Sequence, residues 1–230
     1  MRFSVVIPVL NGDRYLHELL TAVTDQEVGG DFEVLVIDSG STDRSLEIAS
    51  DFPVRVLEIP NSEFQHGRTR NLAFSETSGE LVAFLTQDAT PADNGWLQAY
   101  ADAFDSEPGV GAAYGPHLAR EGASPMMARM LNEFFGAFSP TGETVIHRPG
   151  DTTYLSNSNS CIARVAWEEI PFREIPYSED QALGVDLLAG GWKKAFVPAA
   201  GALHSHDYGA VEQFRLHFDE YRGLRDSIGQ

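Results

Sequence analysis

Cysteine is almost absent from this sequence, and long apolar runs are absent altogether. Cys161 is the only cysteine among the 230 residues, so no internal disulfide can form and a cytoplasmic protein is expected. We expect its thiol to act as a small buried apolar group. No basic leader precedes an apolar stretch at the N-terminus, and no run approaches the ~20 residues of a membrane helix. These features disfavour a secreted or membrane-spanning protein, although a peripheral contact at the inner face of the cell membrane stays open.

Positive charge is also scarce. The chain has 16 lysines and arginines against 34 acidic residues, which gives a net charge of -18, and Lys193 and Lys194 are its only lysines. Nucleic acid and anionic membranes are polyanions, so this balance opposes non-specific binding to them and predicts no nucleic-acid partner. An anionic substrate would need a local cluster of arginine or histidine in so acidic a chain.

Short apolar runs alternate with helical patterns in the first half of the chain. Continuous runs predict strands at 3–7, 34–37, 81–85 and 110–114, and the alternating segment 54–59 predicts a strand nearer an edge. The segments between them predict helices at 15–23, 69–77 and 92–104, with a further helix up to residue 49 capped by Ser41 or Thr42. This order predicts an α/β fold with a mostly parallel, Rossmann-like sheet covered by helices on both faces.

The second half is less regular. The pattern predicts helices at 123–138 and 179–189, a loop at 139–151, one or two short strands within 153–165 and a strand at 195–197. The apolar stripe of the first of these helices is interpreted as core packing, with an acceptor- or lipid-facing surface as the alternative; it comprises Met126, Met127, Met130, Leu131, Phe134 and Phe135. We expect one domain over residues 1–210, with an amphipathic C-terminal helix in 211–230 packed on it or extending from it.

Ligands of such sheets bind at the carboxyl ends of the strands. The polar residues at those ends are Asn11, Asp38, Ser39, Ser41, Gln87 and Asp88. Neither G-x-G-x-x-G nor G-x-x-x-x-G-K-[ST] occurs, so a Rossmann dehydrogenase and a P-loop NTPase are poor interpretations. Asp38 can accept hydrogen bonds from a base N–H or a ribose hydroxyl, or it can simply belong to a strand-to-helix turn.

A second group of polar residues offers charge and acid–base chemistry. Arg68 and Arg70 lie near a helix start that suits a diphosphate, unless they only pair with nearby acids. Asp88 can hold Mn²⁺ or Mg²⁺, or act as a turn residue. The pair Glu179-Asp180 offers a general base, or else a helix cap. His204 and His206 alternate, so both face one way in an extended segment and one of them could complete a metal site with Asp88.

In their order along the chain, these motifs resemble family 2 glycosyltransferases of the GT-A fold. The matching segments are 5–8 with Asn11, then 36–43, 67–71, 84–91, 178–180 and His204, so the resemblance spans about residues 3 to 208. The resemblance implies a nucleotide site at Pro8, Asn11, Asp38, Ser39 and Ser41, with contacts to the donor from Arg68 or Arg70 and from Gln87. It implies a divalent metal (Mn²⁺ or Mg²⁺) bound by Asp88 together with His204 or His206. It also implies that Asp180 is the catalytic base, with Glu179 beside it.

One motif departs from the family pattern. The D-x-D motif reads Thr86-Gln87-Asp88, so its first acid is missing, which predicts weaker or only partial metal dependence. Segments 64–71, 85–89 and 204–206 look like those of bacterial rhamnosyltransferases. That likeness implies inverting transfer of L-rhamnose from dTDP-L-rhamnose to a cell-surface glycan or a lipid-linked precursor.

Three other functions can be compared with this interpretation. A family 2 transferase that uses a UDP- or GDP-sugar fits the same motifs. A non-catalytic nucleotide-sugar or glycan-binding relative fits the altered D-x-D motif, but the intact pair of acids at 179–180 argues against it. A nucleotidyltransferase is disfavoured, because no Gly-rich basic loop follows the first strand.

Overall fold

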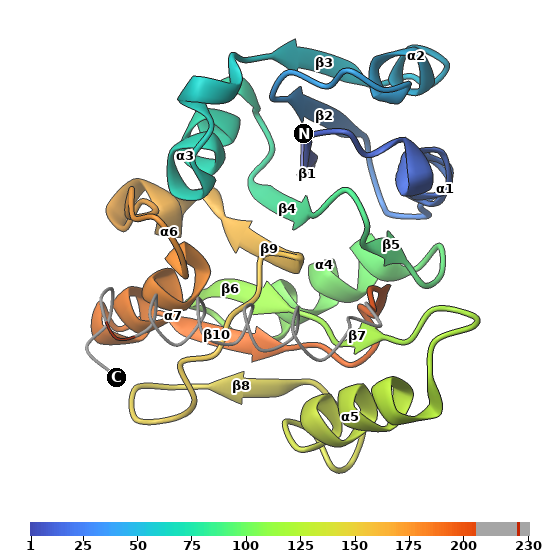
Figure 1. Ribbon diagram of the computed structural model, residues 1–230. Coiled ribbons are helices and arrows are strands. Elements are labelled where there is room, and N and C mark those ends of the chain that lie inside the picture. The colour runs from blue at the N-terminus through green and yellow to red at the C-terminus, as the bar shows by residue number, and fades with distance from the viewer. Residues whose placement is uncertain (206–224, 226–230) are drawn as a thin grey trace.

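A central sheet of eight strands organises the protein. The computed structural model describes residues 1–205 and 225. Across the sheet the strands follow the order β3 (Arg55–Glu58), β2 (Phe32–Asp38), β1 (Phe3–Val9), β4 (Leu81–Leu85), β9 (Asn159–Ala163), β6 (Val110–Tyr114), β10 (Lys193–Phe196) and β8 (Val145–His147) (Figure 1). Strands β9 and β8 run opposite to the other six. The predicted α/β fold with a mostly parallel sheet is confirmed.

Helices cover both faces of this sheet. They are α1 (Asp13–Thr24), α2 (Ser45–Ser50), α3 (His66–Glu76), α4 (Trp96–Ser106), α5 (Pro125–Gly136), α6 (Arg164–Glu169) and α7 (Glu179–Ala189), with a 3-10 turn at Asn61–Glu63. On one face, Phe84 of β4 contacts Phe74 of α3, with ring centroids 5.8 Å apart. Successive side chains of a strand point to opposite faces, so Ala83 and its register partner Cys161 lie on the other face, where Tyr100 of α4 packs.

The core explains why these elements form where the sequence predicts them. Strand β1 is buried along nearly its whole length, and α1 buries four apolar residues at helical spacing: Leu16, Leu19, Leu20 and Val23. Cys161 is fully buried, and this burial raises the pKa of its thiol well above the ordinary value. The thiol therefore behaves as the buried apolar group expected from sequence.

A second, smaller sheet lies beside the first and was not anticipated. It consists of β5 (Thr90–Pro91), β11 (Ala202–Leu203) and β7 (His117–Leu118), with β11 antiparallel to β5 and parallel to β7. The chain approaches itself closely at Gly115, where a Cβ would lie only 1.8 Å from the carbonyl oxygen of Ala200. Only glycine fits there, because any side chain would push β7 away from β11.

Several expectations about local structure were wrong. Segment 139–151 is not only a loop, because it contains strand β8 at the sheet edge. Helix α6 follows β9 and lies mostly beyond segment 153–165, in a part of the chain for which no element was predicted. Helix α2 begins only at Ser45, whose backbone N–H bonds the carboxylate of Asp43, while the Ser41 hydroxyl accepts a bond from the backbone of Asn11. Ser41 therefore joins two loops and does not cap the helix.

The apolar stripe of α5 also differs from its interpretation. Phe135 is buried, Met127 and Leu131 are partly buried, and Met126, Met130 and Phe134 are exposed, so core packing accounts for only part of the stripe. The expected helix at 211–230 falls almost wholly outside the described residues. Within the part that is described, no helix combines the length and apolar character needed to cross a membrane.

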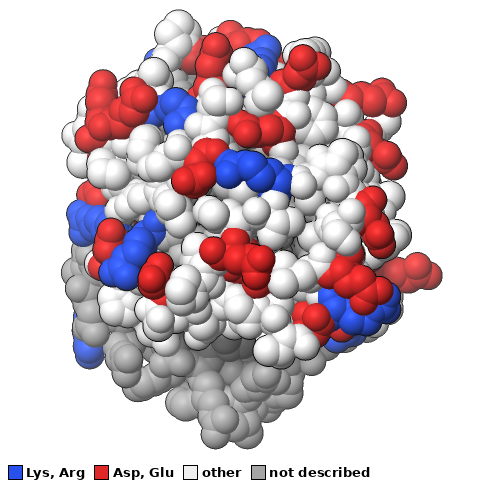
Figure 2. Space-filling model, turned by 90° about the horizontal axis from the view of Figure 1, so that it is seen from above, with Lys and Arg blue, Asp and Glu red and all other residues white. Residues whose placement is uncertain are grey.

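Charged side chains are spread over the surface, and many are paired. Figure 2 shows acidic groups scattered over one face, with basic groups beside several of them. Lys193, for example, lies 2.5 Å from Glu107. Its neighbour Lys194 is fully buried, donates to the carbonyl oxygen of Tyr154 at 2.7 Å, and has its pKa lowered to about 7 by burial.

Candidate active site

A pocket of about 640 Å³ opens at the carboxyl ends of β1, β2 and β4. Its lining residues are Pro8, Val9, Leu10, Ser39, Phe64, His66, Arg70, Thr86, Gln87, Asp88, Ser158 and His204. The volume is within the range of small-ligand sites. Parallel strands that end at one edge bring their following loops together, so residues far apart in sequence meet at this pocket. Half of the lining had been singled out from sequence: Pro8, Ser39, Arg70, Gln87, Asp88 and His204.

Two loops beside the pocket are joined by reciprocal hydrogen bonds. The backbone N–H of Asn11 donates to the Ser41 hydroxyl at 2.9 Å, and the Asn11 side-chain oxygen accepts from the backbone of Thr42 at 2.8 Å. Asn11 takes a left-handed conformation with φ of 52°. Asp38 Oδ1 accepts from the N–H groups of Gly40 and Ser41 at 2.8 and 2.9 Å. Asn11 and Ser41 thus shape the loops and do not line the pocket.

Three buried polar atoms in the described part of the chain lack a hydrogen-bond partner. They are Asp38 Oδ2, Arg70 Nε and Thr86 Oγ1. Arg70 and Thr86 line the pocket, and Asp38 directly precedes Ser39, which also lines it. Buried polar groups are nearly always satisfied, and leaving one unpaired costs about 1–3 kcal/mol. Two of the three residues line the pocket and the third adjoins a lining residue, which indicates a site built to receive a polar ligand.

The segment after β4 is held rigidly. The Gln87 side chain accepts from the backbone N–H of Leu10 at 2.7 Å and donates to its carbonyl oxygen at 3.1 Å. Arg120 donates to the carbonyl oxygen of Asp88 at 2.8 Å and to Thr90 at 2.9 Å, and forms an ion pair with Glu18 at 2.7 Å. Arg120 lies in no recognisable sequence motif, and only the folded chain brings it to this segment, so its contact could not be predicted from the sequence.

Asp88 and His204, which the sequence suggested as ligands of one ion, lie close together. Asp88 Oδ1 and His204 Nε2 are 3.5 Å apart at the pocket lining. Two ligand atoms about 2.1 Å from one ion and at right angles lie about 3 Å apart, so this pair fits a shared divalent cation. A group of three such ligands does not occur among residues 1–205 and 225. His206, the alternative ligand, lies outside the described residues.

The two acids at the start of α7 have different surroundings. Glu179 is buried and lies 2.9 Å from Arg70 Nη1. Asp180 accepts from the backbone N–H of Asn157 at 3.2 Å and does not itself line the pocket, whereas Ser158, the next residue after Asn157, does. Burial and then the nearby Glu179 charge raise the pKa of Asp180 to about 7. A carboxyl with such a pKa suits a general base at neutral pH.

The two arginines of segment 64–71 are also placed differently. Arg70 is buried and lines the pocket. Arg68 is half-exposed on the surface and forms an ion pair with Glu174 at 2.9 Å. The sequence left open which of the two arginines approaches a ligand, and their positions in the structure favour Arg70.

Comparison with known proteins identifies the family. Residues 4–169 match the model of Glycosyl transferase family 2. The chain is 30% identical over 231 residues to the O-antigen chain rhamnosyltransferase RfbN of Salmonella typhimurium, across 95% of this chain and 71% of that protein.

Two solved structures show the same fold. The S. aureus TarS fragment 1–349 in complex with UDP-GlcNAc has a TM-score of 0.70 at 22% identity, over 91% of this chain and 60% of that one. The mannosyltransferase PcManGT from Pyrobaculum calidifontis, in complex with GDP-Man and Mn²⁺, has a TM-score of 0.71 at 20% identity, over 94% and 60%. The chain thus spans about 60% of each solved chain. Together with the family match, these likenesses establish that the chain belongs to glycosyltransferase family 2 and has the GT-A fold.

Proposed function

We propose that this protein is an inverting glycosyltransferase that moves L-rhamnose from dTDP-L-rhamnose to a hydroxyl of a glycan or lipid-linked acceptor in cell-surface polysaccharide synthesis. The observation that carries the donor site is the presence of unpartnered buried atoms on Arg70 and Thr86 in the pocket lining and on Asp38, which adjoins the lining residue Ser39. The rhamnosyl assignment is supported by the likeness to RfbN over nearly the whole chain. The single cysteine supports action on the cytoplasmic side of the membrane.

The nucleoside diphosphate is proposed to bind along this pocket. The free carboxylate oxygen of Asp38 suits a donor N–H of the base or a ribose hydroxyl. The Nε–H of Arg70 suits a phosphate oxygen, because guanidinium groups form strong charge-assisted bonds with phosphate. Asp88 and His204 would hold Mn²⁺ or Mg²⁺, which when bound neutralises charge on the diphosphate leaving group. The substrate would complete the coordination, as is usual for Mg²⁺ sites.

In the proposed reaction, Asp180 takes the proton of the acceptor hydroxyl. The acceptor oxygen forms a bond to the anomeric carbon as the bond from that carbon to the diphosphate oxygen breaks, and the departing diphosphate keeps the electron pair. Attack opposite the leaving group inverts the configuration. Arg70 and Glu179 orient the start of α7, and their ion pair places one positive and one negative charge beside Asp180.

Thermal unfolding with nucleotides tests the donor site. A ligand at 100 times its dissociation constant stabilises a protein by about 2.7 kcal/mol, which raises the midpoint of a domain this size by roughly 5–10 °C. We expect that rise with dTDP plus Mn²⁺, a smaller one without Mn²⁺, and loss of the Mn²⁺ effect in Asp88→Asn. Asp105→Asn, which alters a surface ion pair with Arg2, is the matched control.

The other outcomes separate the parts of the proposal. A rise with UDP or GDP alone would keep the transferase and overturn dTDP-rhamnose as donor. An equal rise with and without Mn²⁺ would overturn the metal site. No rise with any of the three nucleotides would overturn the donor pocket itself.

A further inference from the structure

The imidazoles of His117 and His204 contact each other, and we infer that His117 is a positioning residue that fixes which nitrogen of His204 carries its proton. The inference rests on the proposed function, in which Asp88 and His204 hold a divalent ion. His204 Nδ1 is 3.3 Å from His117 Nδ1, and His204 Nε2 is 3.5 Å from Asp88 Oδ1. One nitrogen of His204 therefore faces the pocket, and the other faces His117.

The small sheet creates this juxtaposition. Strands β7 and β11 pair with His117 opposite Ala202, and His204 follows β11, where its backbone N–H donates to the carbonyl oxygen of Leu118 at 2.9 Å. Asp88 precedes β5 on the other side of β11. His117 thus lies on β7, while His204 and Asp88 adjoin β11 and β5, so the small sheet brings together three side chains that are far apart in sequence.

The hydrogen-bond chemistry admits one arrangement of protons when a metal is bound. A metal binds an unprotonated imidazole nitrogen, so ligation through Nε2 leaves the proton of neutral His204 on Nδ1. That N–H donates to His117 Nδ1, which must then be unprotonated. The proton of neutral His117 lies on Nε2, within 3.4 Å of the Ser156 hydroxyl. With these protons, every contact along the series Asp88, His204, His117 and Ser156 joins groups that are chemically compatible.

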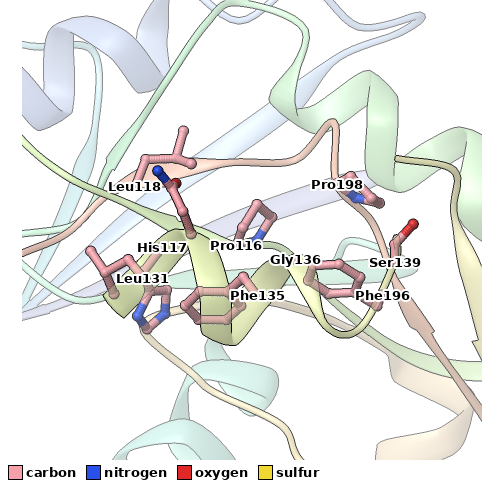
Figure 3. Close-up of a pocket in the computed structure, with 10 residues that line it drawn as sticks. Pro116, His117, Leu118, Leu131, Phe135, Gly136, Ser139, Phe196 and Pro198 are labelled. Carbon is pink, nitrogen blue, oxygen red and sulfur yellow. The ribbon is translucent and has the colours of Figure 1, made fainter. Parts of the chain in front are cut away.

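Packing holds the His117 ring in place for this task. The rings of His117 and His204 meet edge to face, with centroids 4.8 Å apart and an interplanar angle of 81°. Phe135 of α5 packs against His117 with centroids 4.9 Å apart. Figure 3 shows the side chains of His117 and Phe135 at a second pocket between α5 and β7. This pocket has a volume of about 170 Å³. The apolar wall orients the His117 ring, while its Nδ1 faces His204.

A pair of substitutions separates hydrogen bonding from packing. His117→Leu keeps an apolar group against Phe135 and removes the acceptor for His204. His117→Asn keeps an amide oxygen close to the position of Nδ1. Partners of metal-bound histidines typically contribute 10–100-fold to metal affinity. We therefore expect Mn²⁺ affinity to fall about 10–100-fold in His117→Leu and to stay within a few-fold of wild type in His117→Asn.

The measurement is Mn²⁺ binding by electron paramagnetic resonance, with and without dTDP, alongside thermal unfolding of each variant. Spin-echo modulation from a coordinated nitrogen, absent in His204→Ala, identifies the ligand. Unchanged affinity in His117→Leu overturns the inference. Equal losses in both variants that follow their thermal stability also overturn it, because packing alone would then explain them. Absence of Mn²⁺ binding in the wild type would overturn the metal site and this inference together, whereas a failure confined to His117 leaves the metal site standing.

Discussion

Arg70 and Glu179 form a buried ion pair, with Nη1 and Oε1 2.9 Å apart, that joins α3 to the first turn of α7. Asn157 adds a contact from its side-chain amide to Glu179 Oε1 at 3.4 Å. The pair places one negative and one positive charge beside Asp180, and these charges act on its pKa in opposite directions. The charge state of the proposed base thus depends on residues other than the base.

Removing the Glu179 charge should shift the pH dependence of transfer. Glu179 raises the pKa of Asp180 and Arg70 lowers it, so Glu179→Gln should lower that pKa. A base acts when it is unprotonated, so the wild-type rate should rise with pH to a plateau above about pH 7. In Glu179→Gln the rising limb should move to lower pH. The check is the transfer rate from pH 5 to about 9 on protein verified as folded by circular dichroism, and a limb that stays in place would contradict the assigned coupling.

Asp180→Asn should abolish transfer and retain nucleotide binding. The amide is similar in size but cannot accept the acceptor proton, and loss of a general base typically costs about 10²–10⁴-fold in rate. Asp186→Asn, on the same helix and paired with Arg173 at the surface, is the matched control and should keep its activity. Rates are compared with nucleotide-induced shifts of the unfolding midpoint. Full activity in Asp180→Asn would remove Asp180 as base.

Lys194 should make stability depend on pH in the alkaline range. Its folded pKa of about 7 lies below the ordinary value of 10.5, so between these values the unfolded chain binds the extra proton. Stability therefore falls as pH drops from about 10.5 to 7, by up to ~1.4 kcal/mol per pH unit. Lys194→Met lacks this titration. As pH falls, the free energy of unfolding of the variant should therefore increase relative to that of the wild type. Urea unfolding at several pH values measures the difference, and a constant difference would mean that Lys194 titrates normally.

Gly115→Ala should damage both the small sheet and the metal site. The new Cβ would lie 1.8 Å from the backbone oxygen of Ala200, and overpacking of this kind costs about 1–3 kcal/mol. Displacement of β7 from β11 should also weaken Mn²⁺ binding. Gly136→Ala is the control, because its Cβ meets nothing within 4 Å and alanine favours the helix. Equal stability and Mn²⁺ affinity in the two variants would show that β7 can shift without cost.

The large elements could be predicted because each carries its own pattern. Continuous apolar runs indicated β1, β2, β4 and β6, and the observed bounds of α7, Glu179–Ala189, agree with the expected ones. Strands of two or three residues, such as β5, β7, β8 and β11, show no periodicity of their own. Their positions come from pairing with distant segments, which a single sequence does not display.

The same distinction applies to the candidate site. Ser39 and Asp88 were found because they follow strands whose carboxyl ends meet at one edge, whereas Pro8, which lies within β1, was indicated only by the family resemblance. His117 and Arg120 were missed because their relation to His204 and Asp88 exists only after β7 has paired with β11. The roles assigned to all these residues stay predictions until the variants above are measured.

The position of β11 has a consequence for the order of folding. All strands of the large sheet end by Phe196, whereas β11, which pairs with β5 and β7 in the small sheet, begins only at Ala202. A nascent chain can therefore complete its large sheet before residue 204 docks beside Asp88. Metal-dependent nucleotide binding would then report the last stage of folding rather than formation of the core.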